Sequence, residues 1–234
     1  MLMANAAPAH ISMAFGYQGP FFAAASACAS GNDALVTAYN AIAYGDAIAM
    51  ISCGSEATVS PLAIGGFCSM KAMSTRNDDP ARASRPFDKE RDGFVLGEGA
   101  GILVLEEYEH ARARGAKIYC EMLGYGQSAD AFDLVAPDPH GSGVQLALTR
   151  SLKSARIAPS DVDYINAHGT STPMGDPAES KAIEKVFGEH AFKMGVSSTK
   201  SMHGHALGAA GGIEGVASAL AVHEDIMPPT IKYE

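Results

Sequence analysis

The sequence has no tryptophan, few cations and no apolar run of membrane-spanning length. Lys and Arg number 17 against 26 Asp and Glu, giving a net charge of -9. Nucleic acids and anionic membranes attract basic surfaces, so this balance argues against a general binder of either. Residues 1–10 also lack the basic stretch and apolar core of a secretory signal. We therefore expect no nucleic acid, no membrane and no targeting segment.

Cysteine is scarce, and the four present, at positions 28, 53, 68 and 120, form no CxxC pair. Neither a disulfide framework nor a zinc knuckle is indicated, and a reducing cytoplasm fits best. The glycine-rich segment 92–101 fails the GxGxxG test, because Ile102 stands three residues after Gly99. Close packing between backbones explains these glycines better, and no cofactor is expected.

The composition, 47% hydrophobic and 18% charged, is that of an ordinary globular protein. Apolar runs alternate with segments of helical periodicity, which predicts an α/β fold with mostly parallel, buried strands. The expected strands are 21–27, 47–52, 102–106, 118–124, 162–167 and 194–198, and the expected helices are 35–42, 107–114, 144–155, 177–187 and 208–223. We expect a short helix within 1–10, a long irregular connection over 61–92, Asp176 as a helix N-cap, and a last helix buried on every face.

Cys28 is the candidate nucleophile, because it lies where an apolar run ends and a helix begins. Unpaired N–H groups and the positive end of the dipole favour an anion at a helix N-terminus, so a thiol there loses its proton more easily. The alternative is that Cys28 is one more core cysteine. Glu56, also at a strand end, is interpreted as structural.

Two further strand ends carry histidine and lysine. His168 lies in Asn166-Ala-His-Gly-Thr-Ser-Thr-Pro173, and Lys200 and His205 lie in Lys200-Ser-Met-His-Gly-His-Ala-Leu-Gly-Ala-Ala-Gly211. Because the carboxyl ends of parallel strands meet at one edge, Cys28 and these residues are expected to share a site. A metal at His203 and His205 is disfavoured, since no thiol or carboxylate lies at suitable spacing.

Together these motifs resemble the β-ketoacyl-ACP synthases, the condensing enzymes with the layered thiolase-like fold (α/β/α/β/α). The resemblance runs through nearly the whole chain, including segment 85–101 and Gly175-Asp-Pro-Ala-Glu179. The Thr-Ser-Thr-Pro at 170–173 is the form of the bacterial type II synthases of fatty-acid elongation.

The resemblance implies decarboxylative condensation of an acyl-enzyme thioester with malonyl-ACP. Cys28 would take the acyl group from acyl carrier protein. His168 and His205 would donate hydrogen bonds to the malonyl thioester carbonyl, and Lys200 would tune His168 by its charge. The residues expected to bind substrate are Thr170, Thr172 and Phe67.

Two departures from the family pattern are apparent. His203 stands where threonine is common. The chain is also expected to be incomplete at both ends, with 1–116 part of the half that carries the nucleophile and 117–234 part of the half that carries the histidines. The missing ends would include a Gly-Phe-Gly loop that supplies half of the oxyanion hole, so we expect a poorly active chain. They would also include neighbouring strands, whose absence exposes apolar sheet edges, so we expect the chain to be aggregation-prone.

Other functions remain open at this stage. A polyketide ketosynthase would share the nucleophilic cysteine and the two histidines. A non-catalytic partner resembling the chain-length factors, which lack the nucleophilic cysteine, and an inactive truncated product are further alternatives. The expected partners are acyl carrier protein and a second copy in a homodimer. Four cations could dock the acidic carrier: Lys71, Arg76, Arg82 and Arg85.

Overall fold

The computed structural model describes residues 3–234 and contains two compact units, each assembled from separate stretches of chain. The first unit comprises the stretch up to Ala57, Glu98–Cys120 and Ala206–Leu220. The second comprises Thr58–Gly97, Glu121–His205 and Ala221–Glu234. Each unit is described by itself.

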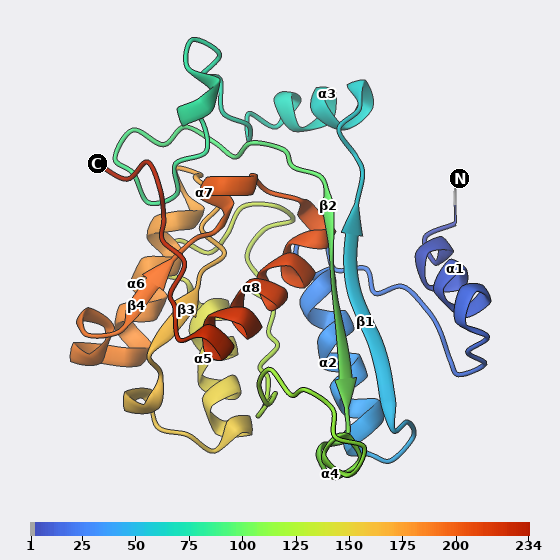
Figure 1. The fold of residues 1–234 in the computed structure, drawn as a ribbon. Coiled ribbons are helices and arrows are strands. Elements are labelled where there is room, and N and C mark those ends of the chain that lie inside the picture. Colours follow the sequence, from blue (N-terminus) through green and yellow to red (C-terminus); the bar gives the residue numbers. More distant parts are fainter. Residues whose placement is uncertain (1–2) are drawn as a thin grey trace. The chain divides into compact units, whose positions relative to one another are not determined.

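The first unit is built on two long antiparallel strands (Figure 1). Strand β1 (Ala49–Glu56) pairs with β2 (Gly99–Glu106) along its whole length, with Ala49 opposite Glu106. Helix α2 (Ser30–Ala43) packs on β1, and α4 (Tyr108–Ala113) follows β2. Helix α1 (Ala6–Phe15) has no buried residue. The helices and the two strands therefore confirm the α/β prediction for this unit.

The start of α8 (Ala210–Glu224) lies against the start of α2. A Cβ atom on Gly31 would lie 2.6 Å from the backbone nitrogen of Gly212, so only glycine permits this approach. The buried residues of α8 are confined to its first turn, whereas Leu220 and Val222 are exposed. The prediction of a helix buried on every face is wrong, because α8 leaves the packed core after that turn.

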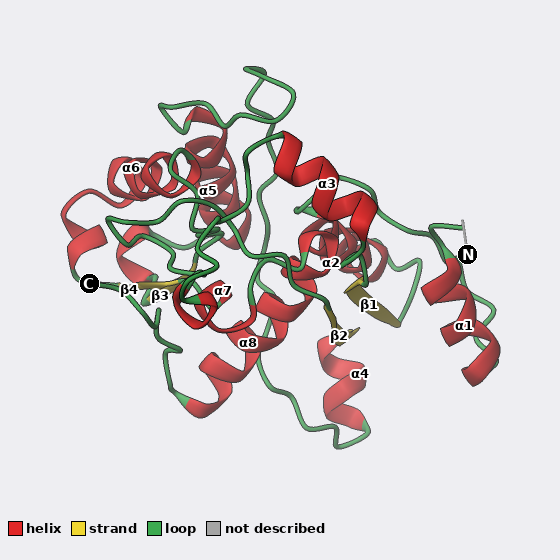
Figure 2. Ribbon diagram, turned by 90° about the horizontal axis from the view of Figure 1, so that it is seen from above, coloured by secondary structure: helices red, strands yellow, loops and turns green. Residues whose placement is uncertain are grey.

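The second unit contains the parallel pair β3 (Tyr164–Asn166) and β4 (Gly195–Ser197). Helices α5 (Ser142–Ala155) and α6 (Gly175–Phe187) lie side by side (Figure 2). Its other elements are α3 (Pro61–Ser69), α7 (Lys200–His203) and the short 3-10 helices η1 (Pro80–Arg82), η2 (Pro159–Asp161) and η3 (Gly188–Phe192). Four apolar residues of α6 form part of the core: Ala178, Ala182, Ile183 and Phe187.

Four local predictions were wrong. Residues 21–27 and 118–124 form no strand, because an apolar run becomes a strand only where a neighbouring strand accepts its hydrogen bonds. The connection 61–92 contains α3 rather than only turns, and its Gly65 and Gly66 are helical. The pair β1–β2 is antiparallel, although β3–β4 is parallel as expected.

Asp176 is not the N-cap of α6. The helix begins at Gly175, and the Asp176 carboxylate accepts hydrogen bonds from the backbone N–H groups of Phe87 (2.8 Å) and Thr172 (3.3 Å). Asp176 therefore hydrogen-bonds two loops to α6 and does not cap the helix.

Among the helices of residues 3–234, none combines the length and apolar character that crossing a membrane requires.

Candidate active site

Cys28 lies in the first unit, two residues before the first residue of α2, and is half-buried. Ala27 before it has φ of 51°, in the left-handed region that non-glycine residues rarely adopt. Two backbone hydrogen bonds close the turn, from Ala29 N–H to Ser26 O and from Ser30 N–H to Ala27 O, both 3.1 Å. The predicted helix start after Cys28 is confirmed, whereas the strand before it is not formed.

His168 lies in the second unit, just beyond the end of β3. The carboxylate of Glu179 on α6 accepts hydrogen bonds from the backbone N–H groups of His168 (2.7 Å) and Gly169 (2.8 Å). These two bonds fix the backbone that carries the imidazole.

His205, also in the second unit, is 3% exposed. Its backbone N–H donates to Val95 O at 2.7 Å, and its carbonyl accepts from Gly97 N–H at 2.9 Å. A Cβ atom at Gly97 would lie 2.6 Å from His203 O, so glycine is needed for the two segments to meet. This explains one glycine of the 92–101 segment by backbone packing, as the sequence predicted.

The imidazoles of His168 and His205 lie next to each other, with ring centroids 5.1 Å apart and planes at 87°. Phe94 packs edge-on against His205 at 5.5 Å, and Phe67 of α3 packs against Phe94 at 5.2 Å. The structure therefore connects Phe67 to the histidine pair through one aromatic ring.

Lys200 is the first residue of α7 and is 1% exposed. Burial, and then the Lys200 charge, lower the pKa of His205 to about 3. The pKa of His168 is also well below its ordinary value, by burial first and then by Lys200 and His205. His168 is exposed to solvent, which weakens the effect of burial on its pKa, but the Lys200 charge also lowers this pKa. Both imidazoles are therefore neutral near pH 7.

Thr170 and Thr172 follow His168, and their hydroxyl oxygens lie 3.0 Å apart. Thr172 Oγ1 also accepts from Gly175 N–H at 3.2 Å. His203, the departure from the family pattern, is hydrogen-bonded through Nε2 to Thr199 Oγ1 at 3.1 Å. Burial, and then Lys200, lower the pKa of His203 too.

Glu179 is the residue of this cluster to which sequence reasoning gave no role. Burial raises the pKa of its carboxyl group, against the two backbone hydrogen bonds and the Lys200 charge, which act to lower it. The signal was present in Gly-Asp-Pro-Ala-Glu179, eleven residues after His168, but only the fold shows that the carboxylate turns back to that histidine.

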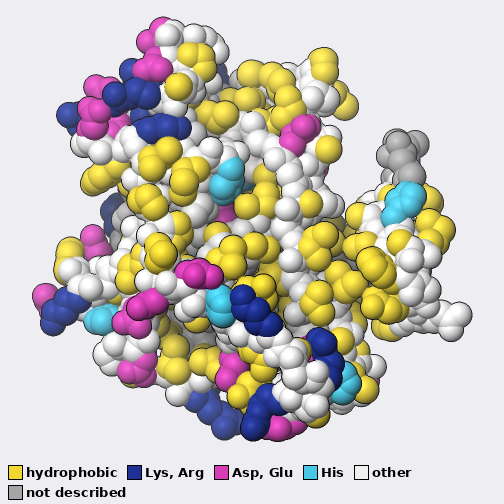
Figure 3. Space-filling view, in the orientation of Figure 1, with side chains coloured by type: hydrophobic (Ala, Val, Ile, Leu, Met, Phe, Trp, Pro, Cys, Tyr) yellow, Lys and Arg dark blue, Asp and Glu magenta, His cyan; other side chains and the backbone are white. Residues whose placement is uncertain are grey.

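The four cations expected to dock an acidic carrier do not form one basic surface. Arg85 is 6% exposed and pairs with Asp92 at 3.1 Å, and Arg82 pairs with Glu234. Charges of both signs intermingle around η1 (Figure 3). Buried Arg85 therefore cannot contribute to a basic surface, and docking of an acidic carrier at the other three cations stays a prediction.

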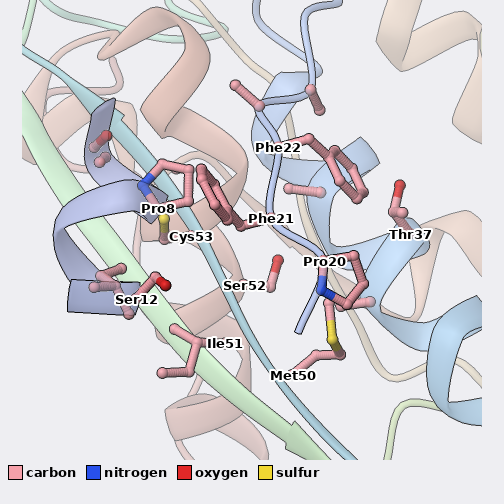
Figure 4. Close-up of a pocket in the computed structure, with 18 of the residues that line it drawn as sticks. Pro8, Ser12, Pro20, Phe21, Phe22, Thr37, Met50, Ile51, Ser52 and Cys53 are labelled. Atoms are coloured by element: carbon pink, nitrogen blue, oxygen red, sulfur yellow. The ribbon is translucent and has the colours of Figure 1, made fainter. Parts of the chain in front are cut away.

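A groove of about 760 Å³ lies in the first unit (Figure 4). Its lining includes Pro8 of α1, Phe21 and Phe22 of the extended segment, and Met50 and Cys53 of β1. Glu56 also lines it and accepts a hydrogen bond from Gly208 N–H at 3.3 Å, a structural contact of the kind expected from the sequence.

Comparison with protein families matches nearly the whole chain. Residues 1–111 match the N-terminal domain of beta-ketoacyl synthases, and residues 119–234 match the C-terminal domain. The 3-oxoacyl-[acyl-carrier-protein] synthase 2 of Coxiella burnetii is 52% identical over 230 residues, which are 98% of this chain and 56% of that protein. The mitochondrial 3-oxoacyl-[acyl-carrier-protein] synthase of Arabidopsis thaliana is 48% identical over 98% of this chain and 50% of its own length.

Comparison with solved structures agrees with the family match and identifies the fold. A type II polyketide-synthase ketosynthase in complex with its acyl-carrier protein matches with a TM-score of 0.96 and 42% identity, over 98% of this chain and 57% of that one. A beta-ketoacyl synthase from Burkholderia phymatum matches with a TM-score of 0.88 and 38% identity, over 98% and 58% of the two chains. The chain thus belongs to the beta-ketoacyl synthase family, has its thiolase-like fold, and spans about half the length of the curated relatives it matches.

Proposed function

We propose that the chain provides the catalytic groups of a β-ketoacyl-ACP synthase, which extends fatty acyl chains by condensation with malonyl-ACP. One observation carries the proposal: two neutral imidazoles, His168 and His205, lie with ring centroids 5.1 Å apart beside the buried Lys200. Such a pair offers two N–H donors to one developing oxyanion. The relatives named 3-oxoacyl-[acyl-carrier-protein] synthase 2 support it.

In the first stage the Cys28 thiolate attacks the thioester carbonyl of an acyl carrier protein. The tetrahedral intermediate collapses, the carrier thiol leaves, and the acyl group remains as a thioester on Cys28. The position of Cys28 before α2 supports this role, since a helix N-terminus stabilises a thiolate.

In the second stage malonyl-ACP loses carbon dioxide, and the electron pair of the broken carbon–carbon bond forms an enolate. His168 and His205 donate hydrogen bonds to the enolate oxygen, each contributing on the order of 3 kcal/mol by comparison with other oxyanion donors. The enolate carbon then attacks the acyl thioester and expels the Cys28 thiolate, giving β-ketoacyl-ACP. Burial and then the Lys200 charge keep the imidazoles neutral by lowering their pKa, while Thr170, Thr172 and Phe67 contact the substrate.

A polyketide ketosynthase is the second candidate. It is favoured by the structural match to a type II polyketide-synthase ketosynthase bound to its acyl-carrier protein. The chemistry would be the same and the acyl substrate different. Against it stand the curated synthase 2 relatives, which share about half of their matched residues with this chain.

Further parts of the proposal follow from the same family. The partners are acyl carrier protein and a second copy of the chain, and the location is the cytoplasm. We retain the division into 1–116 and 117–234 as a proposal. Its boundary falls in the gap between the two matched family domains, 1–111 and 119–234.

The deciding experiment is intact-mass spectrometry of the purified chain after incubation with an acyl-ACP. We expect a mass gain of one acyl group that the Cys28→Ala variant lacks. Fatty-acyl and polyketide carriers tested in parallel separate the two candidates. A folded chain that gains no acyl mass from either carrier would contradict the proposed first stage.

A further inference from the structure

We propose that Ser26 and Asp33 form a hydrogen-bonded clamp that holds the turn carrying Cys28 at the start of α2. The inference rests on the proposed role of Cys28 as nucleophile and makes Ser26 and Asp33 positioning residues. All the groups concerned lie in the first unit.

The turn needs an external constraint, because its central residue is strained. Ala27 has φ of 51°, a conformation in which Cβ crowds the following carbonyl oxygen. Non-glycine residues keep such a conformation only where surrounding contacts over-determine it. Residues 21–25 provide no such constraint from a sheet, since they are not part of a strand.

The contacts that impose the turn come from α2. Ser26 Oγ donates to Asp33 Oδ2 at 2.5 Å, so a hydroxyl before Cys28 is bonded to a carboxylate one turn into the helix. Ser30 Oγ accepts from Ser26 N–H at 2.9 Å and donates to Ala27 O at 2.7 Å. Bonds to a charged acceptor are roughly twice as strong as neutral ones, which makes the Ser26–Asp33 bond the strongest of the three.

The clamp matters for chemistry because the stabilisation of a thiolate by a helix N-terminus falls off within the first turn. If the turn opens, Cys28 moves away from the positive end of the α2 dipole. The reactive fraction of its thiol then decreases, although the thiol itself is unchanged.

The test is the rate at which iodoacetamide alkylates each cysteine of the full chain at pH 7, measured by peptide mass spectrometry. We expect Ser26→Ala and Asp33→Ala each to slow alkylation of Cys28 roughly two- to fivefold, the range a helix terminus supplies. Both substitutions remove the same bond, so the double variant should be no slower than the single variants. Ser26→Thr keeps the donor and the charged acceptor, so it should retain most of the rate. Asp33→Asn keeps only a neutral acceptor, so its rate should fall between those of the parent and Asp33→Ala.

The chain contains its own controls. Cys68 is exposed and should react at an unchanged rate in every variant, and half-buried Cys53 reports unfolding if its rate rises. Ser12→Ala removes a hydroxyl that bonds Tyr17 O rather than the Cys28 turn, and should alter nothing at Cys28. An unchanged or faster Cys28 rate, independent effects of the two substitutions, or failed rescue by threonine and asparagine would overturn the clamp. The assay uses no acyl carrier, so its outcome is separate from that of the proposed condensation.

Discussion

The fold strongly opposes protonation of His205. It is almost completely buried beside Lys200 and His203, and its pKa is lowered from 6.5 to about 3. A histidine that stays neutral when folded contributes stability above its unfolded pKa, and this stability is lost as the pH falls toward the folded pKa. The acid-sensitive window is therefore about pH 6.5 to 3.

We predict that His205→Asn makes the free energy of unfolding less dependent on pH in this window. Asparagine cannot take up the proton that the unfolded histidine binds, so the loss of stability between pH 7 and pH 4.5 should shrink by about 1–3 kcal/mol. Urea unfolding at several pH values measures this. His10→Asn, at an exposed site in α1, is the matched control for the loss of one histidine. A pH dependence equal to that of the parent in the His205 variant would contradict the prediction.

Among the helices and strands, the sequence predicted correctly those elements that are defined by their own apolar residues and by the turns that end them. Helix α5, helix α6 and strand β2 have the expected apolar periodicity and end near the expected turns. The 21–27 prediction failed because strand formation depends on a partner strand that a local pattern cannot reveal. The antiparallel direction of β1 and β2 likewise depends on how a long connection returns.

The residues of the candidate site were likewise predicted only in part. Histidine and lysine in glycine-rich motifs identified His168, Lys200 and His205, and the first and last of these do lie side by side. The role of Glu179 could not be read from spacing, because it depends on a carboxylate of α6 meeting two backbone N–H groups in a loop. The Ser26–Asp33 bond was missed for a similar reason, since neither residue belongs to a recognised motif.

The contact of α2 with α8 gives a prediction for two helices. Gly31→Ala places a Cβ atom 2.6 Å from Gly212 N and 3.0 Å from Gly211 Cα, both backbone atoms that cannot rotate away. The helices must separate, and we expect a loss of roughly 1–3 kcal/mol in the free energy of unfolding. Gly65→Ala in α3 is the control, because open space surrounds it and alanine favours a helix by up to about 1 kcal/mol. Equal effects of the two substitutions in urea unfolding would contradict the steric explanation.

For the whole molecule, the most consequential feature is apolar surface on a sheet with open edges. Among the described residues no further strand pairs with β1 or β2, and Ile102 and Val104 of β2 are 54% and 65% exposed. Unpaired strand edges with apolar side chains are templates for association between chains. The sequence predicts that the isolated chain self-associates, and β2 is where we expect this association to occur.

We predict that Val104→Lys reduces this self-association. A lysine on β2 adds charge repulsion and a desolvation cost to any strand that would pair there, while its aliphatic stem still covers the neighbouring apolar surface. Size-exclusion chromatography with light scattering, over a range of protein concentrations, should give a lower average mass for the variant than for the parent. Leu134→Lys is the matched control, because Leu134 is fully exposed in a loop of the second unit and a lysine there should have little effect on association.

If both variants lower the average mass equally, net charge rather than the β2 surface controls association. If the parent elutes as a monomer at every concentration, the open sheet is tolerated and the predicted association is wrong.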